Sequence, residues 1–144
     1  MNAQEMWEAY SRKNNISSDY SAWAFGDDPD TLAQLVLVGT KTATASAAAA
    51  YALEGENLPK AGEFSVVLDS KDNAVCVIRS TKVYSIPFSE VRENHAWQEG
   101  EGDRSLAYWR LVHERFFSNW MKEVGIEFSE SMIVVCEEFE KVYP

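Results

Sequence analysis

Met132-Ile133-Val134-Val135-Cys136, close to the C-terminus, is a segment in which every residue is apolar. Side chains alternate between the two faces of a β-strand, so a strand without polar positions must be buried on both faces. We therefore expect this segment to be an interior strand of a sheet. Other elements must then cover the sheet on both sides.

Three further strands are expected upstream of this segment. Residues 63–68 and 74–85 predict a β-hairpin, because a polar turn over residues 69–73 joins them. Residues 42–47 alternate Thr or Ser with Ala, which also favours a strand. The second hairpin strand has period-two spacing that is expected to place four side chains on one face: Val75, Val77, Thr81 and Val83.

Helices are predicted between and before these strands. Residues 3–14 place apolar side chains on one helical face. Asp28 is expected to cap a helix that begins at Pro29 and ends at Gly39, since these residue types favour helix starts and stops. Residues 47–53 favour a helix by their alanine content but show no clear buried face.

Two more helices are expected in the C-terminal half. Ser89 is expected to cap a short helix that runs to about residue 98. Asp103 is expected to cap the longest helix, over roughly residues 104–124. The apolar residues of this helix recur every three or four positions, as on the buried face of an amphipathic helix. They are Leu106, Trp109, Val112, Phe116, Trp120 and Val124.

The composition fits one α+β domain that spans residues 1–144. Hydrophobic residues make up 46% of the chain and charged residues 25%, which is close to the average for soluble globular proteins. No linker, repeat or low-complexity tail divides the sequence. The predicted architecture is a set of helices packed around a small, largely antiparallel sheet that can curl into a barrel.

Net charge restricts the partners. The chain has 13 Lys and Arg against 23 Asp and Glu, a formal net charge of −10. Proteins that bind long nucleic acids gain affinity from many basic residues, so tight nonspecific binding to duplex DNA is not expected. A short single strand, a nucleotide or a nucleoside is compatible with the charge.

The expected location is the cytoplasm, without a membrane partner. No apolar run approaches the roughly 20 residues that a membrane-spanning helix needs. The first residues lack the basic and apolar regions of a signal peptide. Cys76 and Cys136 lie in apolar, strand-like runs and are expected to be reduced core residues, as is usual in a reducing compartment.

Three local features are candidates for chemistry. Lys41 follows a glycine that ends a helix, where a lysine can simply neutralise the helix C-terminus. Glu99, Glu101 and Asp103 fall within five residues. They form either a solvated turn or, as weak candidates, ligands of a divalent cation; Glu99 alone is also a candidate general acid or base.

Aromatic residues form the third feature. Trp109 belongs to a periodic face and is expected in the core. Trp23 and Phe25 lie outside any periodic face, and aromatic faces stack nucleic-acid bases at about 1–3 kcal/mol each. They are therefore candidates for stacking on a ligand.

Several sequence blocks resemble the ASCH domain family, which is related to the PUA-like β-barrels. Gly39-x-Lys41-x-x-Thr44 resembles the family signature G-x-K-x-x-[TE]-x-R. Five more blocks resemble a bacterial ASCH branch: Trp23-Ala24-Phe25-Gly26-Asp27, Leu58-Pro59-Lys60-Ala61-Gly62, His95-Ala96 through Leu106, Tyr108-Trp109-Arg110, and Val134-Val135-Cys136-Glu137. The resemblance covers residues from about 20 to the C-terminus, and residues 1–20 are expected to pack on this domain as a helical segment.

The resemblance implies a small PUA-like β-barrel of mostly antiparallel strands, flanked by helices, with a cleft at the lysine motif. It also implies RNA binding, and either hydrolysis of cytidine acylated at its exocyclic amine (4-acetylcytidine type) or ribonuclease activity. For the amidohydrolase, the family's catalytic residues correspond to Lys41, Thr44 and Glu99. Substrate binding is expected from Trp23, Phe25, Ser46, Arg104 and Tyr108.

Ser46 departs from the family signature, which usually has arginine at this position. The change removes a cation suited to phosphate, or transfers that role to Arg104 or Arg110. In one mechanism Thr44 attacks the acyl carbon with Lys41 as its base and Glu99 as the acid. In the other, Glu99 activates water and charged Lys41 stabilises the oxyanion.

Other functions remain open on the sequence. A ribonuclease on single-stranded RNA would use the same residues or a divalent metal, which is the only cofactor expected under any interpretation. A non-catalytic binding module for RNA or a nucleoside, and a plain interaction protein, are further alternatives. For the amidohydrolase, the ribonuclease and the binding module, the expected partner is a nucleoside or short single-stranded RNA. The sequence is compatible with a monomer or a homodimer.

Overall fold

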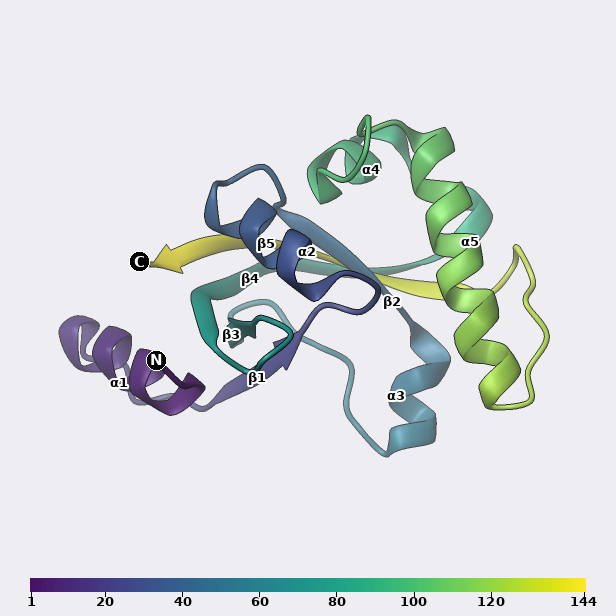
Figure 1. Ribbon diagram of the computed structural model, residues 1–144. Helices are drawn as coiled ribbons and strands as arrows, with labels where there is room; N and C mark the ends of the chain where they lie inside the picture. Colours follow the sequence, from purple (N-terminus) through teal and green to yellow (C-terminus); the bar gives the residue numbers. More distant parts are fainter.

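A five-stranded sheet forms the centre of the computed structural model, which describes residues 1–144 (Figure 1). The strand order is β1-β3-β4-β5-β2. The β1–β3 pair is parallel and the other three pairs are antiparallel. The strands are β1 (Tyr20–Ala24), β2 (Ala43–Ala47), β3 (Phe64–Leu68), β4 (Ala74–Pro87) and β5 (Ile133–Tyr143).

The apolar segment near the C-terminus is an interior strand, as its composition predicts. β5 lies between β4 and β2, and Val134 pairs with Ile86 on one side and Ala47 on the other. Val134, Val135 and Cys136 have no exposed surface. Both faces of β5 are therefore covered.

The long strand β4 bends the sheet. Two register shifts interrupt its pairing with β5, between Val77 and Ile78 and between Ser80 and Lys82. Such bulges increase local twist and curl a sheet toward a half-barrel. They also break the simple alternation expected from residue 75 to residue 83. Thr81 is exposed, whereas Ile78 is buried together with Cys76, so the expected apolar face was wrong there.

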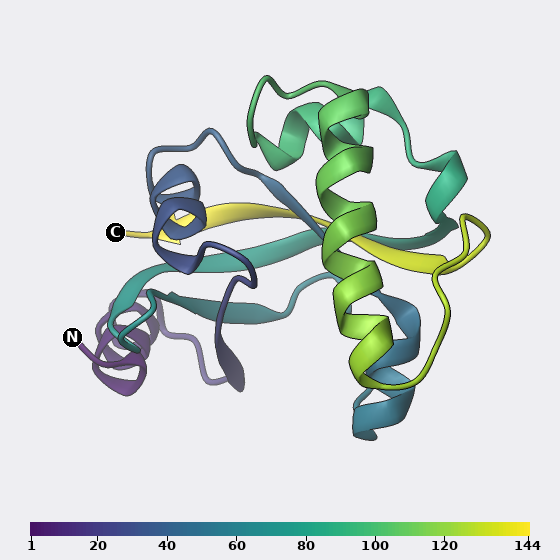
Figure 2. The same cartoon turned by 45° about the vertical axis from the view of Figure 1, so that its right-hand side comes forward.

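Helices cover the sheet. The ribbon shows α5 crossing one face, while α1 lies at the far end of the molecule (Figure 2). α1 contacts β3 and β4, and α2 contacts the same two strands. None of the helices is both long and apolar enough to cross a lipid bilayer. The helices are α1 (Ala3–Asn14), α2 (Pro29–Leu37), α3 (Ala48–Glu54), α4 (Glu93–Glu99), α5 (Leu106–Glu123) and a 3₁₀ turn, η1 (Phe88–Glu90).

Two predicted helix caps are wrong. Ser89 lies inside η1, and α4 begins at Glu93 without a side-chain cap. The side chain of Ser105, and not that of Asp103, caps α5 by accepting a hydrogen bond from the amide of Tyr108 at 3.1 Å. The Asp28 cap of α2 is confirmed, since its carboxylate accepts from the amide of Thr31 at 3.3 Å.

The buried face of α5 lies one residue later than predicted. Trp109, which is part of the predicted face, is buried, but its buried companions are His113, Phe117 and Met121. Phe116 and Val124 are 40% and 43% exposed. The two candidate faces overlap, and a hydrophobic pattern gives no weight to a histidine. The observed buried face includes His113, so the hydrophobic spacing favoured the neighbouring face of the helix.

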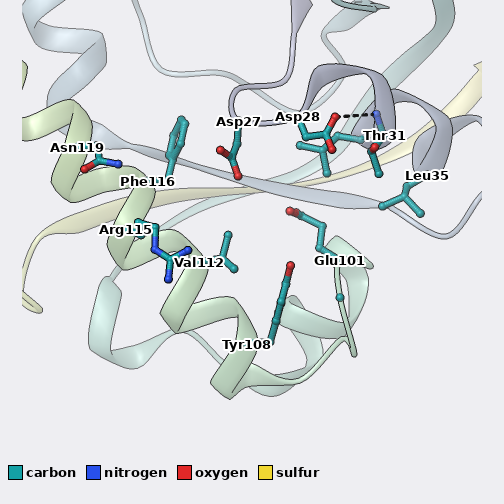
Figure 3. A pocket seen from close by; sticks show the side chains of 12 residues that line it. Asp27, Asp28, Thr31, Leu35, Glu101, Tyr108, Val112, Arg115, Phe116 and Asn119 are labelled. Carbon is teal, nitrogen blue, oxygen red and sulfur yellow. Dashed lines mark hydrogen bonds between the residues drawn. The ribbon is translucent and has the colours of Figure 1, made fainter.

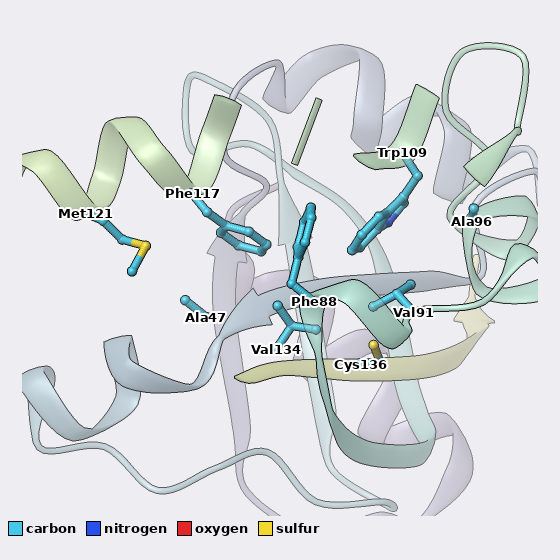
Figure 4. Close-up of a cluster of buried hydrophobic side chains, with 9 residues drawn as sticks. All are labelled: Ala47, Phe88, Val91, Ala96, Trp109, Phe117, Met121, Val134 and Cys136. Carbon is cyan, nitrogen blue, oxygen red and sulfur yellow. The ribbon is translucent and has the colours of Figure 1, made fainter. Parts of the chain in front are cut away.

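The largest buried cluster joins α5 to the sheet and to η1 (Figure 4). Phe88 packs against Trp109, with ring centroids 5.4 Å apart, and against Phe117. The other members are Ala47, Val91, Ala96, Met121, Val134 and Cys136. Both cysteines are buried and free. This cluster fixes the position of α5 relative to β5 and α4.

Gly100, which ends α4, provides a test of this packing. Its φ is +72°, and a Cβ there would lie 2.6 Å from the carbonyl oxygen of Thr40. Gly100→Ala should lower the free energy of unfolding by more than about 2 kcal/mol, because it adds a backbone clash to a left-handed conformation. Urea unfolding measures the change.

Gly55→Ala is the matched control. Gly55 has a similar φ of +68°, but a Cβ there would meet nothing within 4 Å. It should cost only about 1 kcal/mol. Equal losses in the two variants would contradict the close approach of Thr40 to the end of α4.

Candidate functional site

The carboxylate of Glu99 is the centre of a buried polar cluster. Glu99 is the last residue of α4 and is only 1% exposed. Its Oε1 lies 3.2 Å from Lys41 Nζ and 3.4 Å from His113 Nε2. Its Oε2 lies 2.7 Å from His95 Nε2 and accepts a hydrogen bond from Trp109 Nε1 at 2.6 Å. Both oxygens of Glu99 are therefore occupied.

Helix geometry places these partners. His95 and Glu99 are four residues apart on α4, so they share one face of that helix. Trp109 and His113 have the same spacing on α5, and their rings stack with centroids 4.2 Å apart. Two helices thus bring three nitrogen-bearing side chains to one carboxylate.

Lys41 reaches the cluster from the segment between α2 and β2. It is 1% exposed. Its Nζ donates to Glu99 Oε1, to the Glu99 backbone carbonyl at 3.4 Å, and to Glu101 Oε2 at 3.0 Å. It also lies 5.2 Å from the centre of the Phe25 ring. The side chain of Lys41 is therefore part of a buried ion network.

The cluster separates the pKa values of its two carboxyl groups. Burial by itself would raise the pKa of Glu99, but Lys41 and His113 outweigh burial and hold this pKa well below its usual range. Burial raises the pKa of Glu101, and the charge of Glu99 raises it further against the opposing effect of Lys41. Burial would lower the pKa of His113, yet Glu99 raises it above its ordinary value.

A cavity of about 320 Å³ opens beside the cluster, between the start of α2 and one side of α5 (Figure 3). Glu101 lines it and is the only member of the Lys41–Glu99–Glu101–His113 cluster to do so. The lining is more acidic than basic, with Asp27, Asp28 and Glu101 against Arg115. The remaining residues are Thr31, Leu32, Leu35, Gly102, Tyr108, Val112, Phe116 and Asn119.

Residues 21–143 match the ASCH domain family. The chain belongs to the ASCH domain family. The resemblance found in the sequence is thereby confirmed, and so is the fold class, an α+β arrangement with a curled, mostly antiparallel sheet of PUA-like type. The PUA-like fold of this family is known for RNA binding.

Two solved structures are similar over nearly the whole ASCH domain. One is an ASCH domain from Lactobacillus crispatus JV V101, 36% identical, with a TM-score of 0.90; the match covers 98% of this chain and 94% of that one. The other is a protein from Enterococcus faecalis V583, 35% identical, with a TM-score of 0.91, covering 99% and 88%. No curated protein sequence matches the chain.

The structure brings Lys41 and Glu99 together but does not bring Thr44 to them. Ala45 and Ala47 of β2 pack toward α5, so Thr44 points to the opposite face of the strand. Thr44 makes no side-chain hydrogen bond with Lys41 or Glu99. Ser46 lies on the same face as Thr44 and bonds to the hydroxyl of Tyr51 at 2.7 Å.

The aromatic candidates divide between the core and the cavity of this ASCH domain. Phe25 is buried, and Trp23 is half-buried with its ring edge-on to Phe25 at 4.9 Å between centroids. Neither residue lines the cavity. Tyr108 does line it, and its ring rests where a side chain of Gly102 would be.

The arginine candidates are held by backbone carbonyls. Arg104 donates to the carbonyls of Trp97 and Thr40, at 2.8 and 3.3 Å, and stacks on the Trp97 ring at 3.7 Å. Arg110 donates to the carbonyls of Ser89 and Val91. Both side chains therefore connect separate segments of the ASCH domain by hydrogen bonds. Neither side chain lines the cavity.

A divalent cation is a weaker explanation of the acidic residues. Ligand atoms of Glu99, Glu101 and His113 lie within 4.8 Å of one another. However, the Lys41 ammonium lies within hydrogen-bond distance of both carboxylates and supplies their positive charge. Asp103, the other sequence candidate, is exposed and accepts from the amide of Ser105.

Sequence reasoning missed several functional candidates. It assigned no role at the site to His113, and it did not single out Asp27, Arg115 or Asn119. His113 follows Trp109 by one helical turn, so the i, i+4 pair was visible in the sequence. The cavity residues come from α2, α5 and the loops that precede them, which no local pattern brings together.

Removal of the Glu99 charge should strongly reduce the stability of the fold. Glu99→Gln should lower the free energy of unfolding by about 3–5 kcal/mol, because it leaves the buried ammonium of Lys41 without its main counter-charge. Urea unfolding measures the loss. Glu140→Gln is the control, since Glu140 forms only an exposed ion pair with Arg79 and should change stability by at most about 1 kcal/mol. Similar small changes in both variants would contradict the burial of Glu99.

His113 should make stability depend on pH. Its pKa is raised in the folded chain, so the protonated ring stabilises the fold below its unfolded pKa of about 6.5. That contribution should disappear as the pH rises through the raised value. Wild type should therefore lose more unfolding free energy than His113→Gln between about pH 6 and pH 9. Parallel urea titrations test this, and identical pH dependence in the two chains would refute it.

Proposed function

We propose that this ASCH domain is an amidohydrolase that removes an acyl group from the exocyclic amine of a cytidine nucleoside, as in 4-acetylcytidine. The observation that supports it is a buried ammonium–carboxylate cluster that reaches a small cavity through Glu101. Cavities that hold small ligands measure roughly 300–1,000 Å³. A volume of about 320 Å³ favours one small ligand over a long polymer.

Amide hydrolysis needs a group that takes a proton from water and a positive charge near the oxyanion. The Lys41 ammonium lies behind Glu101 in the cavity wall, and its charge supports the second role without contact to the ligand. The hydrogen bonds of Lys41 disfavour it as the base, because its Nζ is occupied by three acceptors within the protein and lies outside the cavity lining. We therefore prefer direct attack by water over attack by Thr44, which faces away from Lys41.

The charge around the cavity bears on the substrate. Three carboxylates and one arginine line it, so a phosphorylated ligand or an RNA strand would meet more repulsion than attraction. A neutral nucleoside avoids this cost. This lining makes a ribonuclease the weaker candidate, and the same argument extends to binding of duplex DNA.

We propose that the reaction needs no metal or organic cofactor, since Lys41 already supplies a cation at the cluster. The proposed partner is a nucleoside or, less well supported, a short single strand of RNA. Both cysteines are free and buried, as is usual in a reducing cytoplasm, where we place the protein.

The test is incubation with a panel of N-acylated cytidines, followed by chromatography of the products. Wild type should release cytidine and the carboxylic acid. Lys41→Met should lower kcat by about 100-fold or more, because it removes the positive charge behind the cavity wall. Circular dichroism checks that the variant is folded.

Lys71→Met is the control, because Lys71 is an exposed residue of the β3–β4 turn and should keep wild-type turnover. Full activity in folded Lys41→Met would contradict the proposed role of Lys41. Quenching of tryptophan fluorescence by these nucleosides without any product would instead favour a binding module.

A further inference from the structure

The two glutamates of the cluster differ in access to the cavity. Glu99 is 1% exposed, and both of its oxygens have partners within the protein. The side chain of Glu101 is 18% exposed and lines the cavity. Its Oε2 accepts from Lys41, while its Oε1 has no hydrogen-bond partner. A molecule in the cavity can therefore meet Glu101 but not Glu99.

We propose that Glu101 is the carboxylate that transfers the proton in the hydrolysis, and that Glu99 is a positioning residue that fixes Lys41 and His113. This inference rests on the proposed function. It assigns the catalytic carboxylate to a residue that neither the sequence signature nor the His95–Glu99 spacing indicates. Lys41 bonds to both glutamates, so it connects the buried carboxylate to the one that lines the cavity.

The backbone holds Glu101 in place. Gly100 and Gly102 flank it, with φ values of +72° and +58°. A Cβ on Gly100 would lie 2.6 Å from the carbonyl oxygen of Thr40, and one on Gly102 would lie 2.5 Å from the ring of Tyr108. Neighbouring groups thus leave no room for a side chain at either residue that flanks Glu101. This arrangement fits a group that must keep one position beside a ligand.

The charges around Glu101 suit proton transfer. Lys41, Glu99 and His113 face it from inside the protein, and Asp27, Asp28, Tyr108 and Arg115 line the same cavity. Burial and the negative charge of Glu99 raise the pKa of Glu101 above its ordinary value, against the opposing effect of Lys41. Glu99 stays ionised because its pKa is held low. Separated pKa values of this kind are typical of carboxyl pairs with different roles.

The reaction balances with one water molecule. Ionised Glu101 takes a proton from water as the water oxygen bonds to the acyl carbon, and the carbonyl electron pair moves to the carbonyl oxygen. The carbonyl then re-forms and the bond from carbon to the exocyclic nitrogen breaks. Protonated Glu101 gives its proton to that nitrogen. The products are a carboxylic acid and the free amine, and Glu101 returns to its ionised state.

Glu101→Gln is the decisive variant, because glutamine keeps the size of the side chain and an oxygen that can accept from Lys41. We expect kcat on the best acylated cytidine to fall by about 100-fold or more, with KM changed less than about threefold. The decline of wild-type kcat/KM at acid pH, which follows protonation of Glu101, should be absent from the residual activity. Cytidine binding, followed by tryptophan fluorescence, should stay at the wild-type level.

Glu114→Gln is the matched control, because Glu114 is exposed on α5 and lies outside the cavity lining. It should behave as wild type. Glu101→Asp should retain part of the activity, since it keeps the carboxyl group but withdraws it by one methylene.

The outcomes separate the two proposals. Wild-type turnover together with undiminished kcat in folded Glu101→Gln would overturn the role of Glu101 alone. Absence of product from the wild-type chain with every acylated cytidine would overturn the proposed function, and the role of Glu101 with it. An equal loss of binding and kcat in Glu101→Gln would show that Glu101 holds the ligand rather than transfers a proton.

Discussion

The contact between Lys41 and Glu99 is the constraint on which the rest of the structure depends. It joins two residues that are 58 positions apart and binds the segment after α2 to the end of α4. Two buried charges are tolerated only where other polar groups compensate them. Trp109, His95 and His113 provide that compensation at Glu99, so both α4 and α5 are committed to one carboxylate.

This constraint also connects the interior of the domain to the cavity. α5 supplies side chains both to the surroundings of Glu99 and to the cavity lining, and Glu101 follows two residues after Glu99, the last residue of α4. A rigid interior therefore supports a group at the surface of the cavity. Such division of labour is common where a site must be precise, because the interior fixes side chains that a mobile loop would not.

Much of the fold could be predicted from local patterns, because strand alternation and helix stops act over a few residues. The interior position of β5 and the cap at Asp28 are examples. The buried face of α5 could not, since a histidine belongs to it and hydrophobic spacing ignores histidine. The pairing of Lys41 with Glu99 came from family resemblance, because no spacing rule links residues so far apart. The orientation of Thr44 depends on how the chain turns between α2 and β2, and that is decided by tertiary contacts.

The lengths of the strands have one more consequence. The outer strands β1 and β2 have five residues each, whereas β4 and β5 have 14 and 11. Short edge strands have few free amide and carbonyl groups, so a strand from another molecule can form few backbone hydrogen bonds with them. Mutual repulsion between chains of net charge −10 acts in the same direction. The edges of this ASCH domain sheet are therefore poorly suited to strand pairing with a second copy of the chain.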